Sequence, residues 1–332
     1  MVLAASIASA LVSAAPLLPQ AAAARAPDDP VLTVHVTGLE KVRGPRVLCV
    51  VAHPDDEIAF GGTVYKIATH LGGAVDIVVI TNGEAGYKYS LLAERLYDKR
   101  LTDPEVGRRE LPKIRRAEVT ESARVLGVRD LYFLNQQDHK YTTDADEVLA
   151  ADADVWDLDL IRRVLDERLA AGDYDFVFGH LPSLTTHGHH QAATIQALEA
   201  VARMAPGRRP VVLGSFGSRT DFPQGPDMQP NRPVTRHSRE VGPFVFDRLQ
   251  KFGFRERLDY RVITNLAMAQ HRSQGAYLMA LNRGERESFV LFALHAPDAA
   301  RRAKALFERL AEPQFAPLDY DEDGNLIRAH VR

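Results

Sequence analysis

Two short clusters of histidine and carboxylate residues carry the chemistry that this sequence can perform. The first, His53-Pro54-Asp55-Asp56-Glu57, directly follows the apolar run at residues 47–51. Such a run is typical of a strand buried on both faces, and open α/β sheets place their catalytic groups beyond the carboxyl ends of strands. His53 and Asp56 are three residues apart, so one turn of backbone can direct both side chains at one point. An imidazole and a carboxylate arranged in this way supply two ligands of a hydrolytic zinc site. The alternative is that both aspartates only cap the following helix, because Asp is favoured at N-caps.

The second cluster contains three histidines within four positions, at His187, His189 and His190. It follows another apolar run, at residues 175–179, and His187 and His190 again have the spacing of three. Two parallel strands that each end in such a turn can supply three ligands and one further polar group to one cavity. Imidazoles with one carboxylate are a common catalytic zinc set that leaves a position open for water. Iron(II) uses the same ligands, so Fe2+ stays an alternative to Zn2+.

The two clusters resemble the motifs of the LmbE-like, or PIG-L, N-acetylglucosaminyl deacetylases, which are zinc enzymes that remove acyl groups from amino sugars and their conjugates. Residues 52–57 match the first family motif, A-H-P-D-D-E, in every letter. Residues 187–190 keep the outer histidines of the family's H-P-D-H motif but replace its Pro and Asp by Gly188 and His189. Residues 115–118 are similar to the family's R-x-x-E segment and residues 271–274 to its H-x-S-Q signature. The resemblance spans about residues 44–295.

This resemblance implies a role for each matched residue. It assigns zinc binding to His53, Asp56 and His190, while the H-G-H-H departure leaves His189 open as the third ligand in place of His190. Asp55 would be the general base that activates the metal-bound water, and His187 would assist the oxyanion or the leaving group. Arg115 stands at the place of a substrate-binding arginine. Zinc lowers the pKa of its bound water to about 7, so an ordinary carboxylate suffices as the base.

The expected function is therefore a zinc-dependent hydrolase that removes an acetyl group from an N-acetylated amino sugar or glycoconjugate, its small-molecule partner. One alternative is an amidase that acts on a larger N-acyl or thiol-conjugate substrate. The other is a metal-free nucleotide-sugar-binding module. That alternative lacks support, because neither a G-x-G-x-x-G nor a P-loop motif follows the first strand.

Composition excludes other classes of protein. The formal net charge of −3 disfavours a nucleic-acid-binding protein, which would show a basic excess. The single cysteine, Cys49, excludes an internal disulfide framework. No stretch beyond the N-terminal segment approaches the length of a stable membrane span.

The N-terminal segment is typical of a secretory signal peptide. Residues 3–18 are apolar and Ala-rich, and residues 22–26 offer A-x-A-like cleavage sites. We expect a signal peptide at residues 1–26, an extension at 27–43, and a single LmbE-like deacetylase domain at 44–332 with a C-terminal helix and tail. Export to the periplasm or the medium follows from this assignment. Because no Lys or Arg precedes the apolar run, a disordered Ala-rich leader on a cytoplasmic protein is the alternative.

Alternating strands and helices must position these clusters. The pattern predicts a Rossmann-like three-layer α/β sandwich with a mostly parallel sheet. Residues 82–111 are expected to form a long polar connection at the rim of the active site, and residues 216–242 an active-site loop. Residues 138–139 follow a strand end and could line the cleft, but we expect a solvated loop there. Expected strands cover residues 31–36, 47–51, 74–81, 131–134, 175–179, 211–213 and 289–294, and expected helices cover 58–71, 113–126, 158–171, 191–203, 270–281 and 298–310.

Overall fold

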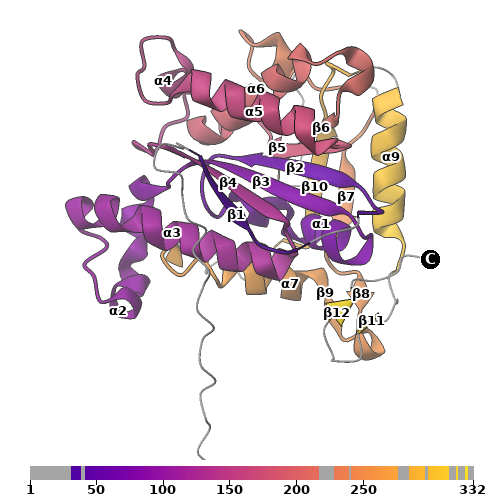
Figure 1. Ribbon diagram of the computed structural model, residues 1–332, viewed down its shortest axis with the longest axis horizontal. Coiled ribbons are helices and arrows are strands. Elements are labelled where there is room, and N and C mark those ends of the chain that lie inside the picture. Colours follow the sequence, from indigo (N-terminus) through magenta and orange to yellow (C-terminus); the bar gives the residue numbers. More distant parts are fainter. Residues whose placement is uncertain are drawn as a thin grey trace, which may run out of the picture.

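One eight-stranded sheet forms the centre of the molecule, with the strand order β1-β4-β3-β2-β5-β6-β10-β7 (Figure 1). The computed structural model describes residues 31–38, 42–216, 228–238, 241–275, 284–295 and 298–313, together with the backbone of 319–320 and 326–327. The signal peptide expected at residues 1–26 and part of the loop expected at 216–242 lie outside the described residues. Among the helices that the structure describes, none is both long and apolar enough to cross a lipid bilayer.

The sheet is mostly parallel. Five adjacent strands, β4, β3, β2, β5 and β6, run in the same direction. The edge strand β1 pairs antiparallel with β4, and β10 runs antiparallel to both β6 and β7. The strands are β1 Leu32–His35, β2 Arg46–Val51, β3 Ala74–Thr81, β4 Asp130–Gln136, β5 Phe176–His180, β6 Val211–Ser215, β7 Phe244–Asp247 and β10 Arg286–Leu291, and the short strands of two separate ladders are β8 Lys251–Phe252, β9 Leu258–Asp259, β11 Asp319–Tyr320 and β12 Leu326–Ile327.

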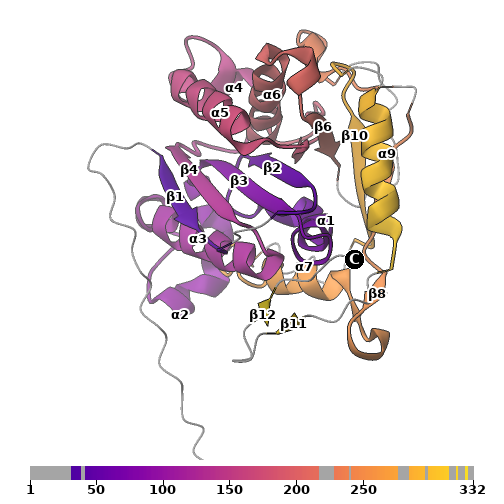
Figure 2. The same cartoon turned by 45° about the vertical axis from the view of Figure 1, so that its right-hand side comes forward.

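Helices cover both faces of this sheet, as the two views show (Figures 1 and 2). Helices α5 and α6 lie on one face, and α1, α3 and α7 on the other, while α9 packs against β7 and β6. The α-helices are α1 Gly61–Tyr65, α2 Glu94–Tyr97, α3 Pro104–Leu126, α4 Asp146–Leu149, α5 Leu158–Gly172, α6 Gly188–Arg203, α7 Tyr260–Met268 and α9 Asp298–Ala311. The predicted three-layer sandwich is confirmed.

Strand β2 shows why the sheet needs helices on both faces. Its residues point alternately to opposite sides of the sheet. Val47, Cys49 and Val51 belong to the core shared with α1, α3 and α7, whereas Leu48 and Val50 belong to the core shared with α5 and α6. All five are at most 1% exposed. A continuous apolar run of this kind is stable only where both faces are covered.

Two predicted helices and one predicted connection differ from the structure. The helix expected at residues 58–71 is divided into a 3-10 segment at Asp56–Phe60, α1, and a π-helical segment at Lys66–His70. The polar connection expected up to residue 111 is largely helical, because a 3-10 segment at Glu84–Ala93 and α2 occupy it and α3 begins at Pro104. Residues 270–274, expected in a helix, form turns after α7, and residues 276–281 lie outside the described residues.

Helix α3 begins at Pro104 because of local capping interactions, and Pro112 within the helix does not end it. The side chain of Asp103 accepts hydrogen bonds from the backbone N–H groups of Glu105 and Val106, and Pro104 occupies the first helical position. This capping satisfies N–H groups that have no partner within the helix, and Pro is favoured at that position. The helix then continues through Pro112 and ends at Gly127, whose φ is +74°.

Candidate active site

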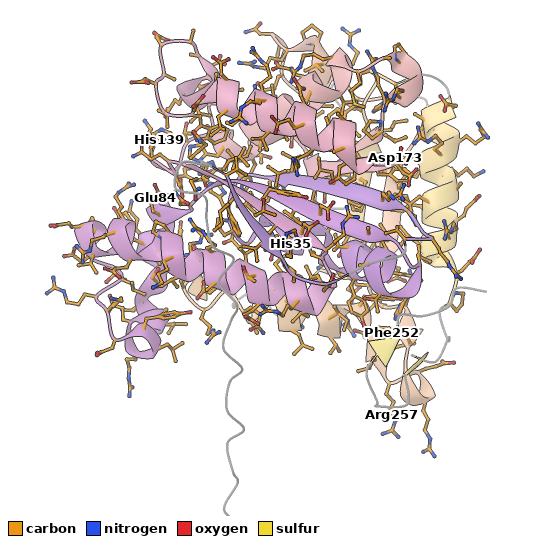
Figure 3. The ribbon with its side chains drawn as sticks, in the orientation of Figure 1. His35, Glu84, His139, Asp173, Phe252 and Arg257 are labelled. Atoms are coloured by element: carbon orange, nitrogen blue, oxygen red, sulfur yellow. The ribbon has the colours of Figure 1, made fainter. Side chains whose placement is uncertain are left out.

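The carboxyl ends of four neighbouring strands bring the polar residues of this protein together. In the sheet, β4, β3, β2 and β5 are adjacent and parallel, so the segments that follow them lie at one edge. The chain leaves β2 toward β3 and β4 and later returns to the opposite side of β2 with β5 and β6. Open α/β sheets bind ligands at such a point, where the strand order reverses. Figure 3 shows His139 and Glu84 at this end of the sheet.

His53, Asp56 and His190 meet at this reversal point. Nδ1 of His53 lies 3.0 Å from Nε2 of His190, which in turn lies 3.0 Å from Oδ1 of Asp56. The third separation, from His53 Nδ1 to Asp56 Oδ2, is 3.6 Å. Ligand atoms of a tetrahedral zinc ion, each about 2.1 Å from the metal, lie roughly 3.4 Å from one another. The three side chains therefore have the spacing of a metal-binding set.

The backbone of the first motif holds Asp56 in this position. Its Oδ2 atom accepts hydrogen bonds from the N–H groups of Ala52 and His53, at 2.9 and 2.8 Å. Burial alone would raise the pKa of Asp56, but the imidazoles of His190, His180 and His53 hold the pKa well below its usual value. Asp56 is therefore an ionised carboxylate with Oδ1 directed at His190, as a metal ligand requires.

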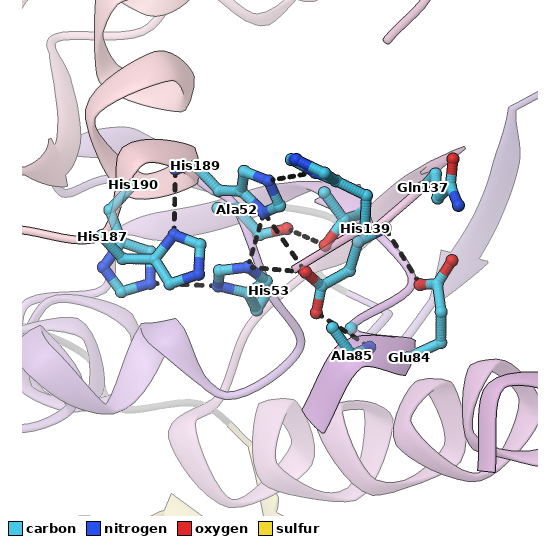
Figure 4. Close-up of polar contacts among 12 residues, drawn as sticks. Ala52, His53, Glu84, Ala85, Gln137, His139, His187, His189 and His190 are labelled. Carbon is cyan, nitrogen blue, oxygen red and sulfur yellow. Dashed lines mark hydrogen bonds and ion pairs between the residues drawn. The ribbon is translucent and has the colours of Figure 1, made fainter. Parts of the chain in front are cut away.

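His53 presents its other ring nitrogen to a second group of residues, shown in Figure 4. Nε2 of His53 lies 3.2 Å from Nδ1 of His189 and 3.8 Å from Oδ1 of Asp138. Burial lowers the pKa of His53, yet Asp138, Asp56 and Asp55 outweigh burial and raise the pKa to about 9. An imidazole that binds a metal through one nitrogen commonly donates its other N–H to a carboxylate, which orients the ring. Asp138 lies on that side of the ring, but its 3.8 Å separation from Nε2 is longer than a hydrogen bond, and His189 is the nearer neighbour of this nitrogen.

His189 continues this network away from the metal-binding set. Its Nδ1 atom lies 3.3 Å from Oδ1 of Asp138, and its Nε2 atom lies 3.0 Å from Nδ1 of His139 (Figure 4). The side chain is fully buried, and burial lowers its pKa to about 4. Together with His53, Asp138 and His187, it forms a second group whose spacing could hold a cation. Of the two histidines considered from the sequence, His190 is the one beside Asp56.

His187 caps helix α6. Its Nδ1 atom accepts the backbone N–H of His189 at 3.0 Å, which fixes the ring proton on Nε2. Burial and the neighbouring histidines lower its pKa to about 3, so the imidazole is neutral at ordinary pH. A neutral ring with this tautomer can donate one hydrogen bond through Nε2.

Asp55 and Arg115 form a buried ion pair. Nη2 of Arg115 lies 2.7 Å from Oδ2 of Asp55, and both side chains are 3% exposed. Arg115 also donates to the main-chain carbonyls of Gly83 and Pro54. The arginine predicted to bind substrate thus contacts the predicted base directly. This contact could not be read from the sequence, because 60 residues separate the partners.

A cavity of about 510 Å³ joins these groups. Its volume lies within the range of small-molecule sites. The 3-10 segment at Glu84–Ala93 and residues 138–141 form part of its wall, as the sequence predicted for the connection after β3. The solvated loop favoured for residues 138–139 is wrong for Asp138, which is 4% exposed and lines the cavity, as the alternative position in the cleft required. The residues of the two motifs and of α3 that line the cavity are His53, Asp55, Arg108, Arg115, His187 and His190.

Two polar residues near the motifs were not considered from the sequence. His180, the last residue of β5, stacks on His190 with ring centroids 4.5 Å apart and lies 3.6 Å from Asp56. Glu84 follows β3 and accepts the backbone N–H of Asp138 at 3.1 Å. The sequence contained one signal that could have placed these two residues in the site, namely their position at the carboxyl end of a strand.

His271 and Glu57 lie together behind the site. Nε2 of His271 is 2.7 Å from Oε1 of Glu57, and both side chains are buried. This contact joins the first motif to the segment that resembles the family's H-x-S-Q signature.

A comparison with protein-family models found a match for part of the chain. Residues 48–201 match the family model PIG-L, described as GlcNAc-PI de-N-acetylase. A search of curated proteins found no match.

Similar solved structures include three from different microorganisms. N,N'-diacetylchitobiose deacetylase from Pyrococcus horikoshii is 20% identical, with a TM-score of 0.44 over 74% of this chain and 84% of that chain. The conserved protein TT1542 from Thermus thermophilus is 20% identical, with a TM-score of 0.47 over 74% and 93%. GalB, the 4-carboxy-2-hydroxymuconate hydratase from Pseudomonas putida, is 19% identical, with a TM-score of 0.44 over 74% and 95%. Likenesses at this level do not identify a substrate.

Proposed function

This chain belongs to the PIG-L family through its domain at residues 48–201, and we propose that it is a zinc-dependent N-deacetylase. The reaction hydrolyses the acetamide of an N-acetylated amino sugar or glycoconjugate to acetate and a free amine. One observation carries the proposal. His53, Asp56 and His190 direct three ligand atoms at one point beside a cavity that Asp55 and His187 also line.

The ligand set fits a divalent metal. It combines two imidazoles with one ionised carboxylate, a set common to catalytic zinc sites and shared with iron(II). Zinc bound there would supply a Lewis acid that polarises the scissile carbonyl and lowers the pKa of a coordinated water. We assign metal binding to His53, Asp56 and His190.

Asp55 is the general base in this proposal. It removes a proton from the attacking water as the oxygen bonds to the acyl carbon. It then delivers that proton to the nitrogen of the leaving amine as the carbon–nitrogen bond breaks. Arg115 keeps the carboxylate in position, because its guanidinium is itself held by the carbonyls of Gly83 and Pro54. General acid–base catalysis of this kind contributes about 10²- to 10⁴-fold to the rate.

His187 stabilises the negative charge that develops on the carbonyl oxygen. Its neutral ring carries the proton on Nε2, since Nδ1 accepts the N–H of His189. Of the two roles that the family resemblance leaves to this histidine, hydrogen-bond donation to the oxyanion suits the neutral ring better than protonation of the amine. One such donor is worth about 3 kcal/mol of transition-state stabilisation.

Metal content and acetate release, measured together, test the proposal. The substrates are N-acetylglucosamine oligomers, and the proteins are the wild type, Asp55→Asn and His190→Ala. We expect one zinc ion per chain in the wild type and in Asp55→Asn, and a large loss of zinc in His190→Ala. Acetate release should fall at least about 10²-fold in both variants.

Each departure from this pattern has a definite meaning. Zinc retained at full occupancy in His190→Ala would move the third ligand to another residue, of which His189 is the nearest candidate. Full activity in Asp55→Asn would remove Asp55 as the base. A zinc-supplemented wild type that binds no metal and releases no acetate would refute the deacetylase proposal.

A further inference from the structure

A second cleft lies at the end of the sheet opposite to the catalytic motifs. It forms where β2 and β5 begin, beside helix α9, and has a volume of about 360 Å³. Figure 3 shows Asp173, which pairs with Arg46 of β2, at this end of the sheet, and His139 and Glu84 at the other end. A strand rises about 3.3 Å per residue, so the start of β2 lies roughly 20 Å from His53. We call this hollow the α9 cleft, and its lining includes Arg43, Asp175, Phe176, Arg302, Leu306 and Arg309.

The α9 cleft carries positive charge that the described part of the chain does not neutralise. Arg43, Arg302 and Arg309 line it, and none of the three forms an ion pair with a carboxylate of the described residues. The one acidic side chain in this lining, Asp175, accepts the backbone N–H of Arg46 at 2.9 Å. Three arginines against one aspartate leave a formal excess of two positive charges.

The guanidinium of Arg302 is held in place by main-chain carbonyls. Its Nη1 atom donates to the carbonyl of Arg209 at 3.3 Å, and its Nη2 atom donates to the carbonyl of Asp175 at 3.0 Å. The charged group also lies over the ring of Phe176, 6.0 Å from the centroid. A guanidinium has five N–H donors, so three remain for a ligand. These contacts orient the side chain and leave its charge uncompensated, as a preformed anion site requires.

A neighbouring histidine responds to the same positive charge. The pKa of His295 is lowered to about 4, first by burial and then by the positive charges of Arg209 and Arg302. Asp298 acts in the opposite direction but does not outweigh them. The electrostatic potential at this end of the sheet is therefore positive.

The cleft combines an apolar floor with a cationic rim. Phe176 and Leu306 are 6% and 3% exposed, whereas Arg302 and Arg309 are half-buried and Arg43 is exposed. Arg302 and Arg309 are seven residues apart on α9, so they lie on the same face of the helix, two turns from each other. The volume of the cleft is at the lower end of the range for small-molecule sites.

We propose that the α9 cleft is a binding site for a small molecule that carries a phosphate group. A phosphomonoester has a charge of about −1.5 to −2 at pH 7, which matches the excess of two positive charges better than a single carboxylate does. Arg302 and Arg309 donate hydrogen bonds to the phosphate oxygens, and Arg43 adds charge on the exposed side. Asp175 accepts a hydroxyl group of the ligand. The cleft shares no residue with the metal-binding set, so this proposal is independent of the deacetylase function.

Calorimetric titration of the zinc-loaded protein with inorganic phosphate tests the site. We expect one phosphate ion per chain with a Kd of about 1 mM or lower, because at least two charge-assisted hydrogen bonds form. A wild-type protein that binds no phosphate under these conditions would overturn the proposal.

Variants of neighbouring arginines locate the bound phosphate. Arg302→Gln should weaken binding at least about 10-fold, because it removes charge-assisted hydrogen bonds. Arg301→Gln is the matched control, since it makes the same change of charge on the same helix at an exposed position that does not line the cleft. Its Kd should change less than about 2-fold, as expected for an exposed charge. An equal loss in both variants would indicate a general charge effect and refute the site.

Two further variants separate the site from folding defects and from the catalytic cavity. Arg309→Gln removes a side chain that has no hydrogen-bond partner among the described residues, so it should weaken binding without disturbing the packing of α9. Arg108→Gln changes an arginine of the catalytic cavity and should leave phosphate binding unchanged. Binding that is lost in Arg108→Gln but complete in Arg302→Gln and Arg309→Gln would place the phosphate in the catalytic cavity and refute the proposal.

Asp175→Asn should have the opposite effect on binding. The substitution removes the negative charge from the lining and keeps an oxygen for the backbone N–H of Arg46. Inorganic phosphate should consequently bind about 2- to 10-fold more tightly, since a repulsion between like charges is removed. A structural disturbance alone would weaken binding, so weaker or unchanged binding in this variant would contradict the assigned phosphate site.

Discussion

Arg115 and Asp55 are paired across 2.7 Å, and each side chain is 3% exposed. The pair joins the middle of helix α3 to the first motif after β2. It therefore links the position of the proposed catalytic base to the packing of a helix. An ion pair as deeply buried as this one is costly to break, because the remaining charge has neither water nor a partner.

Arg115→Gln should consequently destabilise the protein by about 3 to 5 kcal/mol, the usual cost of breaking a buried pair. It should also lower kcat, because Asp55 is no longer held in position. Urea unfolding and acetate-release kinetics measure the two effects. Arg124→Gln on the same helix is the control, since Arg124 is 45% exposed and its loss should cost at most about 0.5 kcal/mol. Similar unfolding midpoints for both variants would contradict the importance of the buried pair.

Asp138→Asn should weaken metal binding without removing any ligand. The substitution removes the charge that faces His53 and His189 but keeps an oxygen for the N–H of Ala85, which Asp138 accepts at 3.2 Å. Loss of a carboxylate that orients a ligand histidine lowers metal affinity about 10- to 100-fold. Competition with a chromophoric chelator measures this change. Asp144→Asn, an exposed position in the same loop, should leave the affinity unchanged, and equal affinities in both variants would exclude the orienting role.

Glu84 should make the metal-free protein less stable as the pH rises. Its pKa is raised by burial to about 7 in the folded state, from an ordinary value of 4.5. The folded state therefore holds this proton more tightly than the unfolded state. The resulting stability is fully present below pH 4.5 and is lost as the pH rises through about 7. The total is on the order of 3 kcal/mol.

Glu84→Gln removes this contribution, because an amide does not titrate. Urea unfolding at pH 5 and pH 8 should show a smaller loss of stability in the variant than in the wild type. Other titrating groups are common to both proteins, so the difference between the two profiles isolates Glu84. Parallel profiles would show that this carboxyl does not keep its proton in the folded state.

Removal of the metal should lower the thermal stability of the wild type. An ion that binds only the folded state stabilises it by about 2.7 kcal/mol when its free concentration is 100 times Kd. Scanning calorimetry with zinc and with a chelator measures the shift in Tm. His190→Ala should show little dependence on zinc at the same concentration. A zinc-dependent shift of equal size in that variant would place the stabilising ion elsewhere.

The two motifs and the main strands were predictable because their signals are local. An uninterrupted apolar run followed by H-P-D-D-E identifies a buried strand and the polar group at its end, and Arg46–Val51 with His53 and Asp56 conforms to this. The start of α3 was missed for a local reason as well. The helix was predicted to begin at residue 113, whereas the Asp103-Pro104 cap starts it nine residues earlier.

The surroundings of the motifs were not predictable in the same way. Asp138 follows β4 and was assigned to a solvated loop, yet it lies beside His53, 85 residues earlier in the chain. Nothing in the residues around Asp138 distinguishes it from an ordinary loop aspartate. Its burial depends on β4 lying two strands from β2 in the sheet, which is a property of the strand order.

The sequence by itself thus determined the chemistry of this protein: the donor types, their spacing of three, and the α/β alternation that places them after parallel strands. The tertiary structure alone decided which groups surround the donors, namely Arg115 beside Asp55, Asp138 beside His53, and Arg108 facing the cavity without a carboxylate partner among the described residues. The physical reason is the separation along the chain over which each effect acts. Backbone periodicity acts over a few residues, whereas ion pairing and burial act between any segments that the strand order brings together.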